Sequence, residues 1–263
     1  MSKVADKLVL LNPGPVNLTS RVRNALTKPD LCHREPEFSR LQGRIRSTVI
    51  NVYGLSKKDY ASVLLTGSGT LAVESMITSL VPPNGKLLVL ANGVYGERIQ
   101  KMAQAHRINH AVVAHQWGEE LNMERIEAQL ADDGEISHVV VVHHETTTGR
   151  LTDLATVGAL CQRYKKAFLV DAVSSFGSED LHFDKWNITA CAASANKCLH
   201  GAPGVSFVVG RRTSFADLEA GESRSVYLDL SSYWQEQERG FSPFTHAVQV
   251  FYAFDEALAE LQE

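Results

Sequence analysis

Ala167-Phe-Leu-Val-Asp-Ala-Val-Ser-Ser-Phe-Gly177 and Ala192-Ala-Ser-Ala-Asn-Lys-Cys-Leu-His-Gly201 decide the fold of this 263-residue chain. The first stretch begins as a short apolar run, which is typical of a buried strand, and that run ends on Asp171. The second stretch is a run of small residues that ends on a lone cation, Lys197. Open α/β sheets bind ligands at the carboxyl ends of their strands, so both side chains are candidates for one site.

The pair of Asp171 and Lys197 suits one kind of cofactor chemistry. Burial among small residues lowers the pKa of a lysine and frees its lone pair, which makes Lys197 a candidate Schiff-base amine. A carboxylate near such a lysine can pair with the pyridinium nitrogen of pyridoxal 5′-phosphate. Either residue alone would more often be an ordinary surface side chain. The pair, following a Gly-rich turn, favours a pyridoxal phosphate site.

Composition is typical of a soluble globular enzyme built on one large domain. The chain is 44% hydrophobic and 21% charged, and its net charge of −4 gives no reason to expect nucleic acid or an anionic membrane as a partner. No segment is long and apolar enough to span a bilayer or to act as a signal peptide. The four cysteines lack metal-ligand spacing, so we expect reduced thiols, a cytoplasmic protein and no metal site.

Apolar runs alternate with helical patterns along most of the chain. We expect strands at 62–66, 86–91, 110–114, 138–142, 167–172, 189–195 and 205–209. We expect helices at about 19–26, 37–53, 71–80, 95–105, 123–131, 154–165 and 245–262. Such units predict an α/β fold with a mostly parallel sheet covered by helices on both faces. Residues 8–16 predict a strand or arm that feeds the rigid turn Pro13-Gly14-Pro15.

Two turns that follow strands could bind a phosphorylated ring. Thr66-Gly-Ser-Gly-Thr70 opens a helix, where glycines and free amides favour a phosphate, although the motif alone is weak. Tyr95, in Asn92-Gly-Val-Tyr-Gly-Glu-Arg98, could stack on a flat ring, although a core tyrosine is the commoner case.

Other polar stretches leave their roles open. His143-His-Glu-Thr-Thr-Thr-Gly149 follows a strand, so its hydroxyls would face the same crevice. Its two histidines make a poor metal site, because adjacent side chains on a strand diverge. Ser194 could bond a phosphate or pack as a small residue. The segment 32–38 is equally a capped loop or an anion-handling loop near the cofactor.

Taken as a set, these stretches resemble the class V aminotransferases of pyridoxal-phosphate fold type I. Within that family they are most similar to the 2-aminoethylphosphonate:pyruvate transaminases. The similar stretches cover nearly the whole chain and lie at 11–15, 66–70, 92–98, 144–149, 170–177, 194–198 and 242–246. The resemblance implies the fold type I large domain with a seven-stranded sheet, a homodimer, and small-molecule amine and 2-oxo acid substrates.

The resemblance also implies a role for each site residue. Lys197 would hold the cofactor covalently and then move a proton, and Asp171 would keep the ring nitrogen protonated. Tyr95 would stack on the ring, and Thr146 would bond the ring hydroxyl or the substrate. The phosphate would be held by Ser68, Gly69, Thr70 and Ser194, and by Thr245 reaching a phosphate in the partner subunit.

The domains that the resemblance implies are an N-terminal arm at 1–18 and a cofactor-binding large domain at 19–263. A C-terminal small domain, which carries a substrate-binding arginine in this family, is absent from the 263 residues, so we expect cofactor binding with weak transamination. The segment 32–38 is closer to the alanine–glyoxylate branch. An alanine–glyoxylate or serine–pyruvate transaminase and an inactive cofactor-binding protein are therefore alternatives. A cysteine desulfurase is disfavoured, because Asn196 rather than His precedes Lys197.

Overall fold

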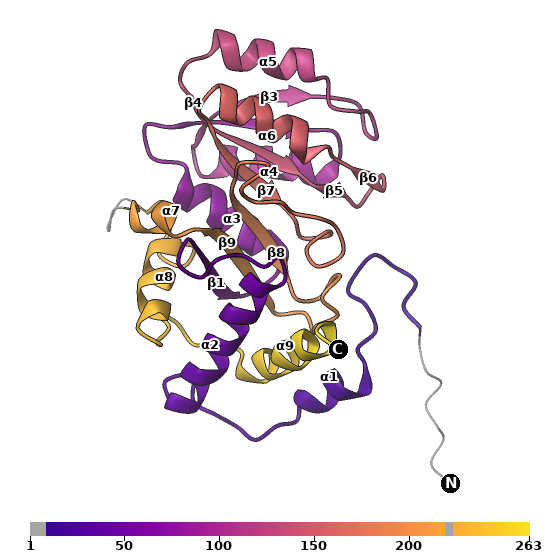
Figure 1. The fold of residues 1–263 in the computed structure, drawn as a ribbon, viewed down its shortest axis with the longest axis vertical. Helices are drawn as coiled ribbons and strands as arrows, with labels where there is room; N and C mark the ends of the chain where they lie inside the picture. Colours follow the sequence, from indigo (N-terminus) through magenta and orange to yellow (C-terminus); the bar gives the residue numbers. More distant parts are fainter. Residues whose placement is uncertain (1–8, 219–222) are drawn as a thin grey trace.

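A seven-stranded sheet runs through the middle of the molecule in the order β1-β9-β8-β7-β4-β2-β3 (Figure 1). This computed structural model describes residues 9–218 and 223–263. The strands are β1 (Tyr60–Thr66), β2 (Lys86–Ala91), β3 (Asn109–Ala114), β4 (Ile136–Val142), β7 (Ala167–Asp171), β8 (Ile188–Ser194) and β9 (Val205–Arg211). Strand β9 pairs antiparallel with both β1 and β8, and the other pairs are parallel. The predicted mostly parallel α/β sheet is confirmed.

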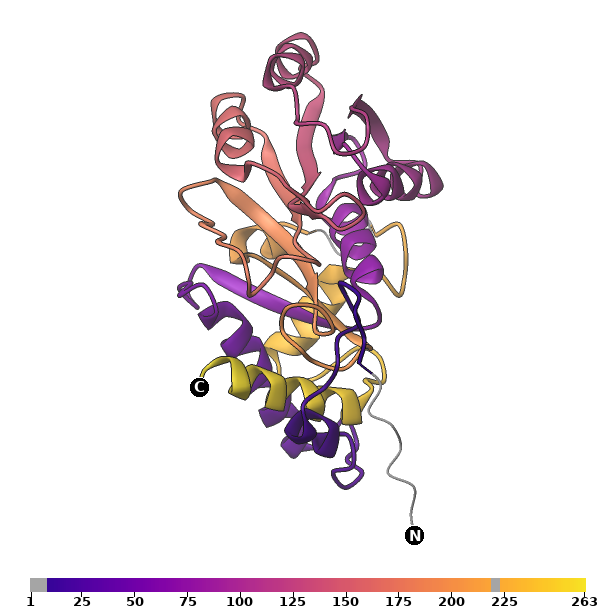
Figure 2. The same cartoon turned by 90° about the vertical axis from the view of Figure 1, so that its right-hand side faces the viewer.

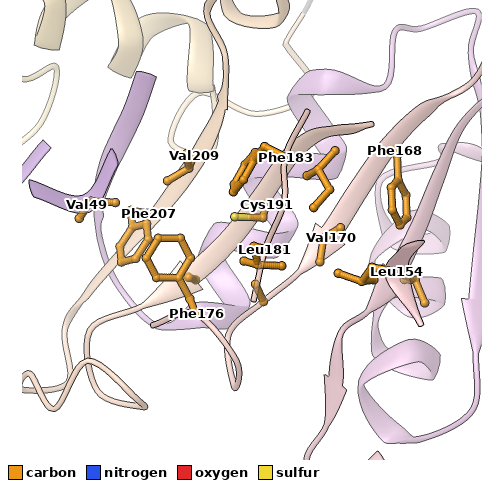
Figure 3. Close-up of a cluster of buried hydrophobic side chains, with 14 of the residues drawn as sticks. Val49, Leu154, Phe168, Val170, Phe176, Leu181, Phe183, Cys191, Phe207 and Val209 are labelled. Carbon is orange, nitrogen blue, oxygen red and sulfur yellow. The ribbon is translucent and has the colours of Figure 1, made fainter. Parts of the chain in front are cut away.

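Helices cover both faces of this sheet. They are α1 (Ser20–Ala25), α2 (Pro36–Asn51), α3 (Gly69–Leu80), α4 (Val94–Ala105), α5 (Met123–Asp132), α6 (Leu154–Arg163), α7 (Arg212–Ala216), α8 (Leu230–Glu238) and α9 (Val248–Leu261). Side chains of α2, α5, α6 and α9 form the core on one face, and those of α3, α4, α7 and α8 form the core on the other. Figure 3 shows part of the first core, where Phe176 and Phe207 meet edge to face.

The central strands read as continuous apolar runs because both of their faces are buried. In β4, Val139 and Val141 point into one core while Val140 and Val142 point into the other. Alternate residues of a strand face opposite sides of a sheet, so each strand contributes to both cores. This burial explains why apolar run length located the strands from the sequence.

Helix α9, near the C-terminus, packs against helices from the N-terminal part of the chain. It lies against α1 and α2 (Figure 2), and Ala253 and Ala257 pack on Val22 and Ala25. Thr19 caps α1, since its hydroxyl accepts the Val22 amide at 3.1 Å. No helix in the described ranges combines the length and apolarity that a membrane crossing requires.

The structure differs from the expectations in three places. Of the strand or arm expected at residues 8–16, the described residues 9–16 form no strand, because side chains take up their amides: Gly14 N–H bonds Asn12 Oδ1 at 2.8 Å, for example. The last helix starts at Val248 rather than near Thr245, because the preceding Ala247 amide bonds Thr66 Oγ1 at 3.3 Å. Helices α7 and α8 and the hairpin of β5 (His144–Glu145) with β6 (Arg150–Leu151) were not predicted, because short elements carry little periodicity.

Side chains rather than another strand cover the outer edge of β1. Gln237 of α8, itself buried, accepts the Leu64 amide at 3.0 Å and donates to the Leu64 carbonyl at 2.7 Å. Arg46 of α2 donates to the Ser62 carbonyl at 2.8 Å. An unpaired edge strand invites pairing with other chains, so these contacts both satisfy and block the edge.

We expect Gln237→Ala to lower the free energy of unfolding by about 2–4 kcal/mol, because it leaves a buried amide and a buried carbonyl unpaired. Urea unfolding monitored by circular dichroism measures the change. The control is Gln235→Ala on the exposed side of the same helix, which should cost less than about 1 kcal/mol. Equal losses of unfolding free energy in the two variants would show that Gln237 does not stabilise the fold through its contact with the edge of β1.

Candidate active site

The candidate residues follow the carboxyl ends of parallel strands. Ser68, Gly69 and Thr70 follow β1, Tyr95 follows β2, Thr146 follows β4, Asp171 ends β7, and Ser194 and Lys197 end or follow β8. Carboxyl ends of parallel strands lie at one edge of a sheet, where α/β proteins bind ligands. The topology therefore gathers segments that are up to about 130 residues apart in the sequence.

Thr70, Tyr95 and Asp171 line one small cavity of about 30 Å³. The remaining lining comes from Val73, Arg98, Ile99, Met102 and Val173. The Arg98 guanidinium lies 4.6 Å from the centre of the Tyr95 ring and donates to Thr70 Oγ1 at 3.3 Å. Three predicted residues are thus brought together, and Arg98 links two of them.

The turn at 66–70 forms an anion cradle with Ser194. Ser68 is the N-cap of α3, but no side chain caps the helix there, so its first amides remain available. The Ser194 hydroxyl is buried and has no hydrogen-bond partner among the described residues. A Cβ on Gly69 would lie 3.3 Å from that hydroxyl and 2.7 Å from the Val173 methyls. Amides at a helix start together with an unsatisfied hydroxyl suit a phosphate.

Asp171 is a buried carboxyl, 6% exposed, at the end of β7. Burial, with a smaller effect from the charge of Glu145, raises its pKa to about 6. The Val173 amide, which donates to Asp171 Oδ1 at 3.0 Å, and the charges of Arg98 and Lys197 oppose this shift. An acid held in this way gains by pairing with a cation, such as a protonated ring nitrogen.

Lys197 is half-buried, and burial lowers its pKa against the opposing effects of Cys198 and Asp171. Its Nζ lies 3.5 Å from the Gly14 carbonyl. Gly14 has a φ of +148°, which favours glycine, and a Cβ there would overlap Lys197 Cδ and lie 3.0 Å from Cε. A lowered pKa raises the fraction of neutral amine, which is the nucleophilic form. The turn at residues 13–15 thus packs on the lysine, a contact that the sequence did not predict.

Thr146 is tied to the stretch after Asp171 by its hydroxyl, which lies 2.7 Å from Ser174 Oγ. The Ser174 carbonyl in turn accepts from His144 Nδ1 at 3.2 Å and from Cys198 Sγ at 3.5 Å. Ser174 therefore connects Thr146 to the residue that follows Lys197.

Thr245 is exposed and does not line the cavity. Its neighbour His246 is buried, and His246 Nδ1 lies 2.8 Å from Thr66 Oγ1, where the phosphate-type turn begins. Burial, with a smaller effect of His33, lowers the pKa of His246 to about 3. The Phe38 ring lies 5.7 Å from the His246 ring, so the segment 32–38 lies near this turn. The side chain of Glu35, at the N-cap of α2, makes no capping hydrogen bond.

Comparison with known proteins settles the family. Residues 20–263 match the model of the family described as aminotransferase class-V. The chain belongs to the class V aminotransferases.

Relatives of this class V aminotransferase include two 2-aminoethylphosphonate–pyruvate transaminases. That of Bacillus cereus is 37% identical and that of Bacillus mycoides 38% identical, each over 257 residues, which are 97% of this chain and 70% of the relative. Among solved structures, alanine–glyoxylate aminotransferase from Nostoc has a TM-score of 0.88 at 26% identity, over 98% of this chain and 68% of its own. Pyridoxamine–pyruvate aminotransferase from Mesorhizobium loti has a TM-score of 0.87 at 27% identity, over 98% of this chain and 66% of its own.

Membership identifies a pyridoxal-phosphate-dependent aminotransferase, as the sequence predicted. The residues present fit that cofactor. The unsatisfied Ser194 hydroxyl and the uncapped start of α3 at Gly69 suit the phosphate, and the buried Asp171 carboxyl suits the ring nitrogen.

Five further residues of this class V aminotransferase surround the predicted ones. They are Gly14, Arg98, Glu145, Val173 and Ser174. Arg98 had a usable signal in the sequence, because it follows Tyr95 by three residues on a helix and so shares its face. Apart from Val173, which lies two residues after Asp171, the others make contacts between segments that are distant in the sequence and leave no local pattern.

We expect Asp171→Asn to stabilise the cofactor-free protein at pH 7 by about 1–3 kcal/mol. The folded protein holds the Asp171 proton up to about pH 6, whereas the unfolded chain loses it near pH 3.8. Stability from this group is therefore present at low pH and is lost as the pH rises from about 4 to 6. Unfolding free energies measured across pH 4–8 test this, since the Asn variant should lack that loss.

Asp153→Asn provides a contrast with the opposite sign. Asp153 caps α6, and its hydrogen bond from Thr156 lowers its pKa, so its contribution is present above the unfolded pKa and is lost as the pH falls. That variant should be destabilised at neutral pH. If Asp171→Asn also loses stability at pH 7, the ionised Asp171 carboxylate does not destabilise the cofactor-free protein, and the prediction is wrong.

Proposed function

We propose that this class V aminotransferase moves the amino group of 2-aminoethylphosphonate to pyruvate, which gives phosphonoacetaldehyde and alanine. The observation that carries the proposal is the juxtaposition of Asp171, Tyr95 and the Ser194–Gly69 cradle in a chain that is 37–38% identical to transaminases of that name. In this proposal residues 19–263 are the cofactor-binding domain, and residues 1–18 are an arm whose Gly14 contacts Lys197.

Pyridoxal phosphate, when bound, supplies an electron sink for the negative charge that develops at the substrate carbon. Lys197 Nζ is the group that takes a proton from that carbon and returns it, because its lowered pKa keeps part of the amine neutral. Asp171 holds the proton on the ring nitrogen by charge pairing. Both roles depend on burial, which strengthens charge interactions by excluding water.

The remaining residues orient the ring. Tyr95 and Val173 line the same cavity as Asp171. Ser68, Gly69, Thr70 and Ser194 bind the phosphate group, and Thr146 bonds the ring hydroxyl or the substrate from its position on Ser174. Binding at the phosphate and stacking on the ring fix the reacting bond near Lys197, which lowers the entropic part of the barrier.

An alanine–glyoxylate or serine–pyruvate transaminase is the second candidate. The structural match to the Nostoc alanine–glyoxylate aminotransferase, with a TM-score of 0.88, favours it. Both candidates use the same cofactor residues, so only the amino donor separates them. A protein that binds the cofactor with little or no transamination is a third outcome of the same test.

We expect 2-aminoethylphosphonate to convert the cofactor on the protein from its aldehyde to its amine form. Conversion at roughly 1 s⁻¹ or faster, a rate typical of enzymes, would support the proposed function and contradict the weak transamination expected from the sequence. Stopped-flow absorbance follows the conversion, and phosphonoacetaldehyde is trapped as its hydrazone. Lys197→Ala is the control: borohydride should fix the cofactor on the Lys197 peptide of the wild type and nowhere on the variant.

Faster conversion by alanine or serine would favour the second candidate. A cofactor that binds but is converted by none of the three amines would show a binding protein. Cofactor fixed by borohydride on the Lys197→Ala variant would remove Lys197 from its role.

We also propose that two copies of the chain complete each site, with Thr245 reaching the phosphate bound by its partner. Exposed apolar side chains adjoin the segment of Thr245: Val226 is 83% exposed and Phe241 54% exposed. Tyr227, 40% exposed, bonds the Thr66 carbonyl at 3.2 Å and contacts Phe244 at 5.0 Å between rings. Exposed apolar patches of this kind mark interaction surfaces.

Sedimentation should therefore give a dimer that Val226→Asp shifts toward the monomer, because a buried unpaired charge disfavours association. Thr245→Ala should keep the dimer and weaken pyridoxal phosphate binding about tenfold, the loss of one hydrogen bond to a charged group. Leu261→Asp, at the exposed end of α9, is the control and should leave the assembly unchanged. A wild-type monomer that binds the cofactor tightly would contradict the shared site.

A further inference from the structure

Glu145 is a fully buried acid, 0% exposed, at the end of the short strand β5. Among the described residues, no lysine, arginine or histidine forms an ion pair with it. Burying a carboxylate is costly unless hydrogen bonds compensate, so the partners of Glu145 indicate what it is kept for.

The Glu145 carboxylate binds two segments of the site. Oε2 accepts the Tyr95 amide at 3.1 Å, and Oε1 accepts the Thr147 hydroxyl at 2.7 Å. Its backbone carbonyl also accepts the amides of Thr148 at 3.2 Å and Gly149 at 2.9 Å, which closes the turn after Thr146. One residue thus holds both the start of α4 and the loop that carries Thr146.

Helix α4 has no side-chain cap of its own, because its N-cap is Gly93. The first amides of a helix need acceptors, and the helix dipole favours a negative charge there. Glu145 supplies both from another part of the chain. Gly93 is extended, with a φ of −179°, so its requirement is one of space: a Cβ there would overlap Glu145 Cγ and lie 2.7 Å from Oε2.

We propose that Glu145, seated against Gly93, is a positioning residue that fixes the ring of Tyr95 and the hydroxyl of Thr146 relative to each other. The inference rests on the proposed cofactor site, because Tyr95 would stack on the ring and Thr146 would bond its edge. Arg98, one turn into α4, extends the same arrangement, since it lies over the Tyr95 ring and donates to Thr70.

The charge of Glu145 also acts on the acid of the site. Charged and titratable groups near the Asp171 carboxyl are Glu145 from β5, Arg98 from α4, Lys197 after β8 and Cys191 within β8. Glu145 raises the pKa of Asp171, whereas Arg98 and Lys197 lower it. If cofactor binding requires ionised Asp171, binding should weaken as the pH falls through about 6. Removing the Glu145 charge should move that midpoint to lower pH, and removing the Arg98 charge should move it to higher pH.

The experiment measures pyridoxal phosphate dissociation constants from pH 5 to 8 on the full chain, beside melting temperatures of the cofactor-free proteins. Glu145→Ala and Gly93→Ala should weaken binding about tenfold or more, because the cap is lost or displaced. Glu145→Gln keeps an acceptor oxygen, so it should bind more tightly than Glu145→Ala and show the lower pH midpoint. Arg98→Met should show the higher midpoint.

Two matched controls separate positioning from general effects. Glu124→Gln removes an exposed acid from the first turn of α5, and Gly43→Ala adds a methyl where nothing lies within 4 Å. Both should stay within about twofold of the wild type at every pH, as expected for surface changes.

Unchanged affinity and an unchanged pH midpoint in Glu145→Gln and Glu145→Ala would overturn the inference. A lower melting temperature with wild-type binding in both would also overturn it, because Glu145 would then be merely structural. If Glu145→Ala does not fold, Glu145→Gln and its pH midpoint decide alone. A wild type that binds no pyridoxal phosphate would instead overturn the proposed function, which this set of measurements detects first.

Discussion

The arrangement of the site depends on a carboxyl group that is buried at the end of a central strand. Asp171 lies between Val142 of β4 and Ala192 of β8, so neighbouring strands shield it from water on both sides. Burial alone would leave this acid largely protonated below its raised pKa of about 6. A cationic ring nitrogen would reverse that preference. The sheet therefore forms a position that favours a cation even without the cofactor, and Thr70 and Tyr95 line the same cavity.

The sequence predicted the sheet well because of the way its strands are buried. Strands β4 and β7 are covered on both faces, so their mainly apolar sequences, expected as strands at 138–142 and 167–172, located them within two residues. Asp171 could be found because it ends an apolar run, and Lys197 because it ends a run of small residues. The order of the strands did not follow from composition, but βα repetition restricts it strongly.

Contacts between distant segments could not be predicted in the same way. The Gly14 turn reaches Lys197 across 183 residues, and Glu145 reaches the Tyr95 amide across 50. Neither contact has a periodic signal, since each depends on where the backbone turns after its strand. Helix α8 was missed for a related reason: its buried face is short, and its most specific contact is polar, from Gln237 to Leu64. Roles assigned to Ser68, Thr146 and Thr245 still rest on the family resemblance.

Polar groups near the candidate site are less well compensated than an arginine at the opposite edge of the sheet. Near the candidate site, Ser194 lacks a partner, Asp171 has a raised pKa and Lys197 a lowered one. At the opposite edge, the Arg224 guanidinium is only partly buried, and it donates to the carbonyls of Thr78, Val81 and Pro82 at 2.6–3.1 Å. The unpaired Ser194 hydroxyl and the buried Asp171 carboxyl near the candidate site lower the stability of the free protein. A ligand that offers an anion to Ser194 and a cation to Asp171 would offset this loss. Such a ligand stabilises the folded state by mass action, so the same groups that weaken the free protein would make its fold depend on the cofactor.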